Sequence, residues 1–252
     1  MPPARPWDAP RAPELAARPA EQPQPAPRHG GNFMSVAIFL LLVSGVLIQA
    51  YRDLSQPGAW DYWSDRYFSP SMTASPADNV DLGGRRRQAL ALHGKIGAAS
   101  ASWFRERLDE AKLKTGDLIV ISSLGGDVGQ SIIMGEVIRS RGLVTAVGTL
   151  DASGQLKPAS CASACVFVFA GGKTRYGVEG SRLGVHRFTT RTAGIDPVAD
   201  TQRVTGMVLS YLTKMGISAS LVEAMSRTSD ISWLSIPQAV TMNLITDPLR
   251  RP

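Results

Sequence analysis

The pattern of apolar and polar residues divides the chain into a polar tail, one uninterrupted apolar segment, and a longer region of short apolar runs. The apolar segment, FMSVAIFLLLVSGVLI, runs from Phe33 to Ile48, and no charged residue occurs between Gly30 and Tyr51. With its flanks this span approaches the ~20 residues needed to cross the hydrocarbon core of a bilayer. A helix buried in a soluble core would carry a polar face, and this segment has none. We therefore predict a transmembrane anchor over residues 33–50.

A cleaved signal peptide is the main alternative for this segment. The stretch before it is long for a signal peptide, and Ile48-Gln49-Ala50 is a poor cleavage context. Charge does not decide the orientation, because arginines lie close to the span on both sides. The commoner arrangement for one N-terminal anchor keeps the short tail inside and translocates the larger domain. We therefore predict an uncleaved, single-pass anchor that precedes a translocated domain.

The two segments that flank the anchor differ in composition. Residues 1–32 contain nine of the 17 prolines and almost no aliphatic side chain larger than alanine. They cannot bury enough apolar surface to offset the entropy lost on ordering, so we predict a disordered, Pro-rich tail. Residues 51–84 are rich in aromatic side chains, which suit the headgroup level of a membrane or packing on a domain. We predict a juxtamembrane linker there.

Beyond the linker, strand and helix patterns alternate, which predicts crossover units and an α/β domain over residues 85–250. The run Leu118 to Ser122, LIVIS, is apolar throughout and suits a parallel strand buried on both faces. The predicted strands are the short apolar runs 89–93, 118–122, 143–147 and 182–186. The predicted helices are the segments of helical periodicity 100–113, 128–139, 201–215, 219–227 and 237–243.

Composition and charge exclude several classes of function. The 252 residues suffice for one domain of ordinary size with appendages. Two cysteines exclude a disulfide-dense scaffold and a four-thiolate zinc site, and three histidines disfavour a histidine-rich metal centre. We predict neither a metal nor a cofactor. The net charge of +6 would suit nucleic acid, but no basic run exceeds Arg85-Arg86-Arg87 and no aromatics alternate with it. We therefore predict a solvated basic surface and no nucleic-acid partner.

One serine lies in a sequence context that suits nucleophilic chemistry. Ser163 has small neighbours and precedes the apolar run 166–170, and a helix starting there would direct free N–H groups at developing negative charge. A serine needs a base, and His186 follows a predicted strand, where functional side chains of α/β sheets commonly emerge. The plainer interpretation of each is an N-capping serine and a structural histidine. Taken alone, neither residue establishes a site.

Several short motifs, in this order, resemble those of the Clp protease proteolytic subunit and its relatives in the Clp-protease/crotonase superfamily. The motifs are Ser122-Ser-Leu-Gly-Gly-Asp-Val128, Ala162-Ser163-Ala164, Ser181-Arg-Leu-Gly-Val-His186, Leu234-Ser-Ile-Pro-Gln-Ala-Val240 and Asn243-Leu-Ile245. The resemblance covers about residues 88–247. It implies an α/β fold of the Clp-protease/crotonase β-β-α superhelix type, preceded here by the tail and the transmembrane helix.

The resemblance also implies roles for individual residues. Ser163 would be the nucleophile, His186 the general base, and Gly126 and Ala164 the donors of an oxyanion hole. The third member of the triad would be Asp230, although one extra residue precedes the Leu-Ser pair here compared with the family pattern. Asp200 and Asp196 are the alternatives for this acid.

The two cysteines lie two residues before and two residues after Ser163. Cys161 and Cys165 are either small hydrophobic residues packed in a buried helix or partners in a disulfide across one turn. On a single helix the separation of the two Cα atoms would be near the upper range for a disulfide, so such a bond would be tight.

Taken together, the sequence predicts a membrane-anchored serine hydrolase, a peptidase with a Ser-His-Asp triad. We expect a peptide or protein substrate, a lipid bilayer as partner through residues 33–50, and a homo-oligomer. We place the anchor in the bacterial inner membrane and the domain in the periplasm, where the lack of ATP would make the activity ATP-independent. One alternative is a catalytically silent Clp-like assembly or binding module. The other is a crotonase-like thioester-binding enzyme.

Overall fold

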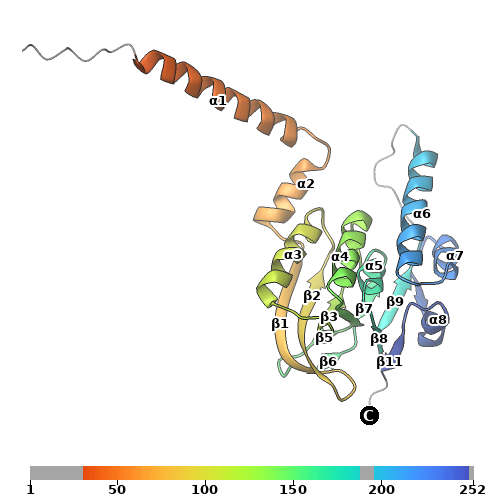
Figure 1. The fold of residues 1–252 in the computed structure, drawn as a ribbon. Helices are drawn as coiled ribbons and strands as arrows, with labels where there is room; N and C mark the ends of the chain where they lie inside the picture. Colours follow the sequence, from red (N-terminus) through yellow and green to blue (C-terminus); the bar gives the residue numbers. More distant parts are fainter. Residues whose placement is uncertain (1–30, 188–195, 250–252) are drawn as a thin grey trace, which may run out of the picture. The chain divides into compact units, whose positions relative to one another are not determined.

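The computed structural model describes residues 31–187 and 196–249, and the chain divides into two compact units, residues 1–52 and 53–252 (Figure 1). The predicted Pro-rich tail lies outside the described residues, apart from its last two. Helix α1 (Gly31–Leu54) contains the predicted anchor. Its segment Phe33–Leu54 has a mean hydropathy of 2.4 and is not buried. At 1.5 Å per residue it is about 33 Å long, enough to cross the hydrocarbon core.

The second unit is an α/β domain built on a six-stranded sheet. Its strands, in spatial order, are β1 (Met72–Asp81), β2 (Arg86–Gly94), β3 (Leu118–Ser122), β4 (Val144–Val147), β8 (Arg175–Val178) and β11 (Asp247–Leu249). β1 and β2 pair antiparallel, and every other neighbouring pair in this sheet is parallel. The α/β class predicted from the sequence is confirmed.

A second, three-stranded sheet has the order β10-β9-β7. Its strands are β7 (Ser160–Ala162), β9 (Arg182–Val185) and β10 (Ser232–Leu234). β7 runs parallel to β9, and β10 runs antiparallel to it. A small hairpin joins β5 (Thr149–Leu150) to β6 (Leu156–Lys157).

The helices of this unit connect successive strands, except for the first two, which precede β1 (Figure 1). They are α2 (Ala59–Trp63), a π-helical turn η1 (Ser64–Phe68), α3 (Ser100–Ala111), α4 (Val128–Ser140), α5 (Cys165–Ala170), α6 (Pro197–Lys214), α7 (Ser220–Ser226) and α8 (Ile236–Thr241). All six side chains of α5 are buried, which is why its sequence, CVFVFA, has no polar face.

The domain begins earlier than the boundary at residue 85 suggests, because β1 occupies residues that the sequence analysis assigns to a linker. β1 pairs with β2 from Met72 opposite Gly94 to Asp81 opposite Arg86. Its sequence, MTASPADNVD, is largely polar because it is the edge strand and most of its side chains are exposed. Pro76 is compatible with an edge strand, where a missing N–H breaks no ladder. An exposed, largely polar edge strand of this kind has no apolar run from which it could be predicted.

Arg175, at the start of β8, is a buried cation bound by main-chain carbonyls. It is 2% exposed, and burial lowers the pKa of its guanidinium to about 10. Nε donates to the carbonyl of Leu244 (2.9 Å), and the terminal nitrogens donate to those of Asn243 (2.7 Å) and Gly172 (3.1 Å). The guanidinium therefore connects the start of β8 with the segment that leads into β11.

Helices α4 and α5 approach so closely that glycine is required at their contact. A Cβ on Gly135 would collide with the hydroxyl of Tyr211 and would lie 2.7 Å from the carbonyl oxygen of Phe167. That hydroxyl donates a 2.7 Å hydrogen bond to the same carbonyl, and burial raises the pKa of Tyr211. The α4–α5 contact thus depends on one residue without a side chain.

We expect Gly135→Ala to lower the unfolding temperature of the detergent-solubilised full chain, because the added methyl group must displace the Tyr211 hydroxyl. Overpacking typically costs about 1–3 kcal/mol, and a lost buried hydrogen bond adds to it. Gly206→Ala is the matched control, since Gly206 lies in α6 with nothing within 4 Å of an added Cβ. That change should stabilise the chain by about 0.5–1 kcal/mol. The midpoint of thermal unfolding is measured by circular dichroism. An unchanged midpoint in Gly135→Ala would contradict this close packing.

Candidate active site

Ser163 lies at a sharp turn between strand β7 and helix α5. Its φ angle is +57°, in the left-handed region that residues other than glycine seldom adopt. Its N–H donates to the carbonyl of Gly184 (2.9 Å), and its own carbonyl accepts from the N–H of Val166 (3.0 Å). Such a conformation costs about 1–3 kcal/mol and persists only where the surroundings determine it. A strained strand-to-helix turn of this kind exposes the hydroxyl of a serine.

His186 follows β9, the strand parallel to β7. The register puts Ala162 opposite Gly184. Ser163, which follows β7, and His186, which follows β9, therefore leave the small sheet at the same edge. The Oγ atom of Ser163 and the Nε2 atom of His186 are 2.7 Å apart. Both side chains are partly exposed, so the pair is open to a substrate.

The second nitrogen of the imidazole determines its tautomer. His186 Nδ1 is 2.7 Å from the main-chain carbonyl oxygen of Arg187. A carbonyl can only accept a hydrogen bond, so Nδ1 carries the proton. Nε2 is then unprotonated and accepts the hydrogen bond from the hydroxyl of Ser163. This tautomer allows the imidazole to take up the proton of the serine.

Two N–H groups beside Ser163 have no acceptor within the described residues. They belong to Gly126 and Ala164. Ile96 donates to the carbonyl of Gly125 (2.9 Å) and accepts from the N–H of Asp127 (2.8 Å), so the N–H and carbonyl of Gly126 point away from Ile96. Ala164 precedes the first residue of α5, where N–H groups have no partner inside the helix. Each can donate to an oxygen that gains negative charge.

The sequence analysis missed two residues that hold this turn, Ser123 and Gly125. Ser123 is buried, and its Oγ accepts from the N–H of Gly125 (3.0 Å). The main chain of Ser123 also accepts from Ala162 and donates to Ser160, which links the end of β3 to β7. A Cβ on Gly125 would lie 2.7 Å from the Cβ of Ser163. The signal available in the sequence was a serine between the apolar strand and the paired glycines.

Asp230 is not brought into contact with the imidazole. Its side chain is exposed, and its carboxylate has no hydrogen bond or ion pair with any described residue. The loop turns at Thr228, whose Oγ1 accepts from the N–H of Asp230 (3.1 Å) and whose carbonyl accepts from the N–H of Arg187 (2.9 Å). The two alternative acids make other interactions: the side chain of Asp196 caps α6, and Asp200 forms an ion pair with Arg203.

Cys161 and Cys165 form a disulfide that encloses Ser163. Their Cα atoms are 5.3 Å apart, well within the usual range for such a bond. They do not share a helix, which was the case considered from the sequence. Cys161 lies in β7 and Cys165 begins α5, so the sharp turn between them brings the two residues together.

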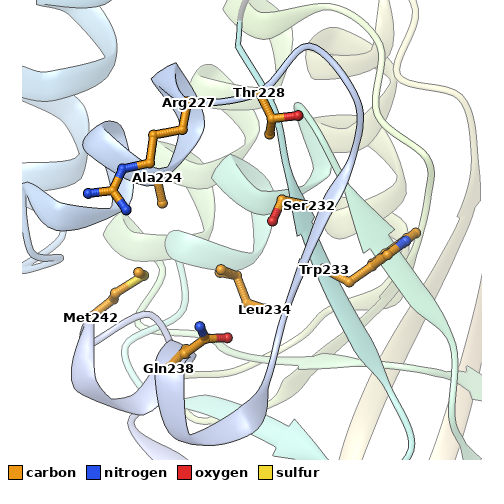
Figure 2. Close-up of a pocket in the computed structure, with 8 residues that line it drawn as sticks. All are labelled: Ala224, Arg227, Thr228, Ser232, Trp233, Leu234, Gln238 and Met242. Atoms are coloured by element: carbon orange, nitrogen blue, oxygen red, sulfur yellow. The ribbon is translucent and has the colours of Figure 1, made fainter.

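A pocket of about 430 Å³ adjoins the strand that carries His186 (Figure 2). Its lining mixes polar and apolar side chains: Ala224, Arg227, Thr228, Ser232, Trp233, Leu234, Gln238 and Met242. Ser232 pairs with Val185, the residue before His186, which puts this pocket beside the end of β9. Among the described residues, no group of three or more His, Cys, Asp or Glu side chains could hold a metal ion.

Comparison with solved structures identifies the fold. ClpP1 from Listeria monocytogenes matches with a TM-score of 0.50 and 16% identity, over 65% of this chain and 92% of that chain. A mutant of the same protein matches with the same TM-score and identity over 91% of its length. The domain therefore has the fold of a ClpP-type protease, and the resemblance predicted from the sequence is confirmed at the level of the fold.

A mutant of the membrane-bound stomatin-specific protease 1510-N also aligns, with a TM-score of 0.46 and 15% identity, over 65% of this chain and 78% of that chain. No protein-family model matches the sequence, and no curated protein matches it.

We expect Gly125→Ala to slow covalent labelling of Ser163 by a fluorophosphonate at least about tenfold, because the new methyl group would push the serine away from His186. Gly84→Ala is the matched control: Gly84 also has a positive φ, +82°, but nothing lies within 4 Å of an added Cβ. Backbone strain alone would therefore affect both variants, and displacement of Ser163 only the first. Equal labelling rates in the two variants would contradict this role for Gly125.

Proposed function

We propose that this chain is a serine hydrolase that cleaves peptide bonds. The observation that carries the proposal is the 2.7 Å contact between Ser163 Oγ and His186 Nε2. Serine is a weak nucleophile until a base takes its proton, and this contact provides the base. The fold shared with the ClpP1 protease of Listeria monocytogenes supports peptides as the substrate class, as an analogy of fold.

The reaction follows the acyl-enzyme route. As Ser163 Oγ bonds to the carbonyl carbon of the scissile peptide, His186 Nε2 takes the hydroxyl proton. The N–H groups of Gly126 and Ala164 donate to the oxygen that becomes negatively charged, which is commonly worth about 10²–10³ in kcat for one such donor. The imidazolium then gives its proton to the leaving amine. Water hydrolyses the acyl-enzyme by the same steps.

The main-chain carbonyl of Arg187, rather than Asp230, orients the imidazole in this proposal. It fixes the tautomer that the reaction needs. A carbonyl has only a partial negative charge, so it stabilises the imidazolium less than a carboxylate would. We therefore propose a Ser-His dyad and expect turnover slower than that of an enzyme with a complete triad.

A catalytically silent assembly or binding module is the second candidate. The observation that favours it is that, among the described residues, no carboxylate hydrogen-bonds to His186 Nδ1. Such a module would keep the fold to form homo-oligomers or to hold a protein partner. A thioester-binding enzyme of the crotonase type, the third possibility raised by the sequence, predicts affinity for coenzyme A.

Helix α1 is proposed to anchor the hydrolase in the bacterial inner membrane, with residues 53–252 in the periplasm. Its length and hydropathy support a single membrane crossing. The periplasm lacks ATP, so this hydrolase would work without the ATP-driven unfoldase that serves Clp proteases. Its substrates would then be flexible, small or close to the membrane.

We expect Ser163→Ala to abolish fluorophosphonate labelling while the chain stays folded, because alanine fits a turn already lined by Ala162 and Ala164. His186→Ala should slow labelling by orders of magnitude, since the hydroxyl then keeps its proton. Asp230→Asn should leave the rate within about twofold of wild type if the dyad assignment is correct. Gel fluorescence measures all three rates. Labelling that persists in Ser163→Ala would refute the nucleophile, and a silent module would give no labelling in any form of the chain.

We expect the full chain to remain with membranes after alkaline carbonate extraction, because α1 has no charge between Gly30 and Tyr51. The same chain without residues 1–52 should be recovered in the soluble fraction. Immunoblotting of the two fractions makes the comparison. The intact chain in the soluble fraction would contradict the anchor.

A further inference from the structure

We propose that the Cys161–Cys165 disulfide is a positioning element for the candidate nucleophile, Ser163. The inference rests on the proposed hydrolase function and adds a role for two residues that the mechanism above does not use. Ser163 is the central residue of the five-residue ring that the disulfide closes. Nothing else covalent constrains the turn on which the Oγ–Nε2 contact depends.

The disulfide connects two elements that are each held by the core. Cys161 is the middle residue of β7; it lies opposite Leu183 of β9 on one side and bridges to Ser123 on the other. Cys165 begins α5, whose side chains are all buried. The bond between them therefore adds a covalent restraint on the distance across the turn.

Apart from the disulfide, the turn keeps its conformation mainly through main-chain hydrogen bonds, among them those to Ser123, Gly184 and Val166. Its three residues, Ala162, Ser163 and Ala164, have small side chains, and Ser163 has the unfavourable φ of +57°. Relaxation of Ser163 to a negative φ would swing Oγ away from His186 and turn the N–H of Ala164 away from the oxyanion site. The N–H bond to Gly184 opposes this change, and the disulfide adds a restraint that does not depend on a hydrogen bond.

A purely stabilising role makes a different prediction from a positioning role. Both cysteines are fully buried, so without the bond they would still pack as small apolar residues. A five-residue ring also removes little entropy from the unfolded chain compared with a long loop. We therefore expect loss of the bond to change the geometry at Ser163 more than it changes the stability of the domain.

The experiment compares the oxidised full chain with two double variants, Cys161→Ala/Cys165→Ala and Cys161→Ala/Cys165→Val, in the same detergent. The readouts are the labelling rate of Ser163 by a fluorophosphonate, kcat and KM for a small peptide ester, and the unfolding temperature. Both variants should label at least about tenfold more slowly and lose kcat with little change in KM. The valine restores buried volume but not the covalent bond, so it separates packing from the restraint.

A reversible test uses the wild-type chain. Dithiothreitol supplies two electrons and two protons, the S–S bond becomes two thiols, and the reagent closes to its cyclic disulfide. Labelling should slow on reduction and recover after reoxidation with oxidised glutathione, whereas neither double variant should respond to either reagent.

Four outcomes would overturn the inference. Equal labelling rates in the wild type and both variants would remove the positioning role, and so would recovery of the rate in the valine variant alone. A loss of rate that only follows a fall in the unfolding temperature would show a stabilising role instead. Absence of labelling in the oxidised wild type would overturn the proposed function, and with it this inference, so the two failures are distinguishable.

Discussion

The parallel pairing of β7 with β9 is the constraint on which the candidate site depends. Ala162 lies opposite Gly184, and the N–H of Ser163 extends the ladder by one further bond to the Gly184 carbonyl. Ser163 and His186 therefore leave their strands at the same edge of the small sheet. A slip of one residue would direct the side chains of a strand to the opposite face of the sheet. Ser123 joins β7 to the main sheet, so the Gly-Gly turn shares the same register.

Elements with extensive buried surface could be predicted from the sequence, because burial leaves a pattern of apolar residues. β3 is found at Leu118–Ser122 because a strand covered on both sides is apolar almost throughout, and α4 because residues 128–139 have helical periodicity. β1 and β10 could not be found in this way. Both are edge strands, and β10 has only three residues, so neither has enough buried side chains to leave an apolar pattern.

Some features of the candidate site follow from short sequence motifs, and others depend on contacts between segments that are distant in the sequence. The hydroxyl of Ser163, the imidazole of His186 and the glycine turn follow from short motifs, since each depends on its own strand end. The partner of Nδ1 does not, because it depends on the path of the loop around Thr228. The main-chain carbonyl of Thr228 accepts a hydrogen bond from the N–H of Arg187, and the carbonyl of Arg187 faces the imidazole of His186.

The main-chain carbonyls that bind the guanidinium of Arg175 have a consequence for the order in which the domain can form during synthesis. Two of its acceptors, Asn243 and Leu244, follow it by about 70 residues in the sequence, whereas Arg175 begins β8, an interior strand of the sheet. Without those residues, the guanidinium has, within the described part of the chain, only the carbonyls of Gly172 and Met215 as acceptors to compensate its burial. The start of β8 can therefore be fully packed only after residues 243–244 have been synthesised and have reached it. A chain shortened to end before Asn243 would leave this buried charge with fewer acceptors, and its domain would be less stable.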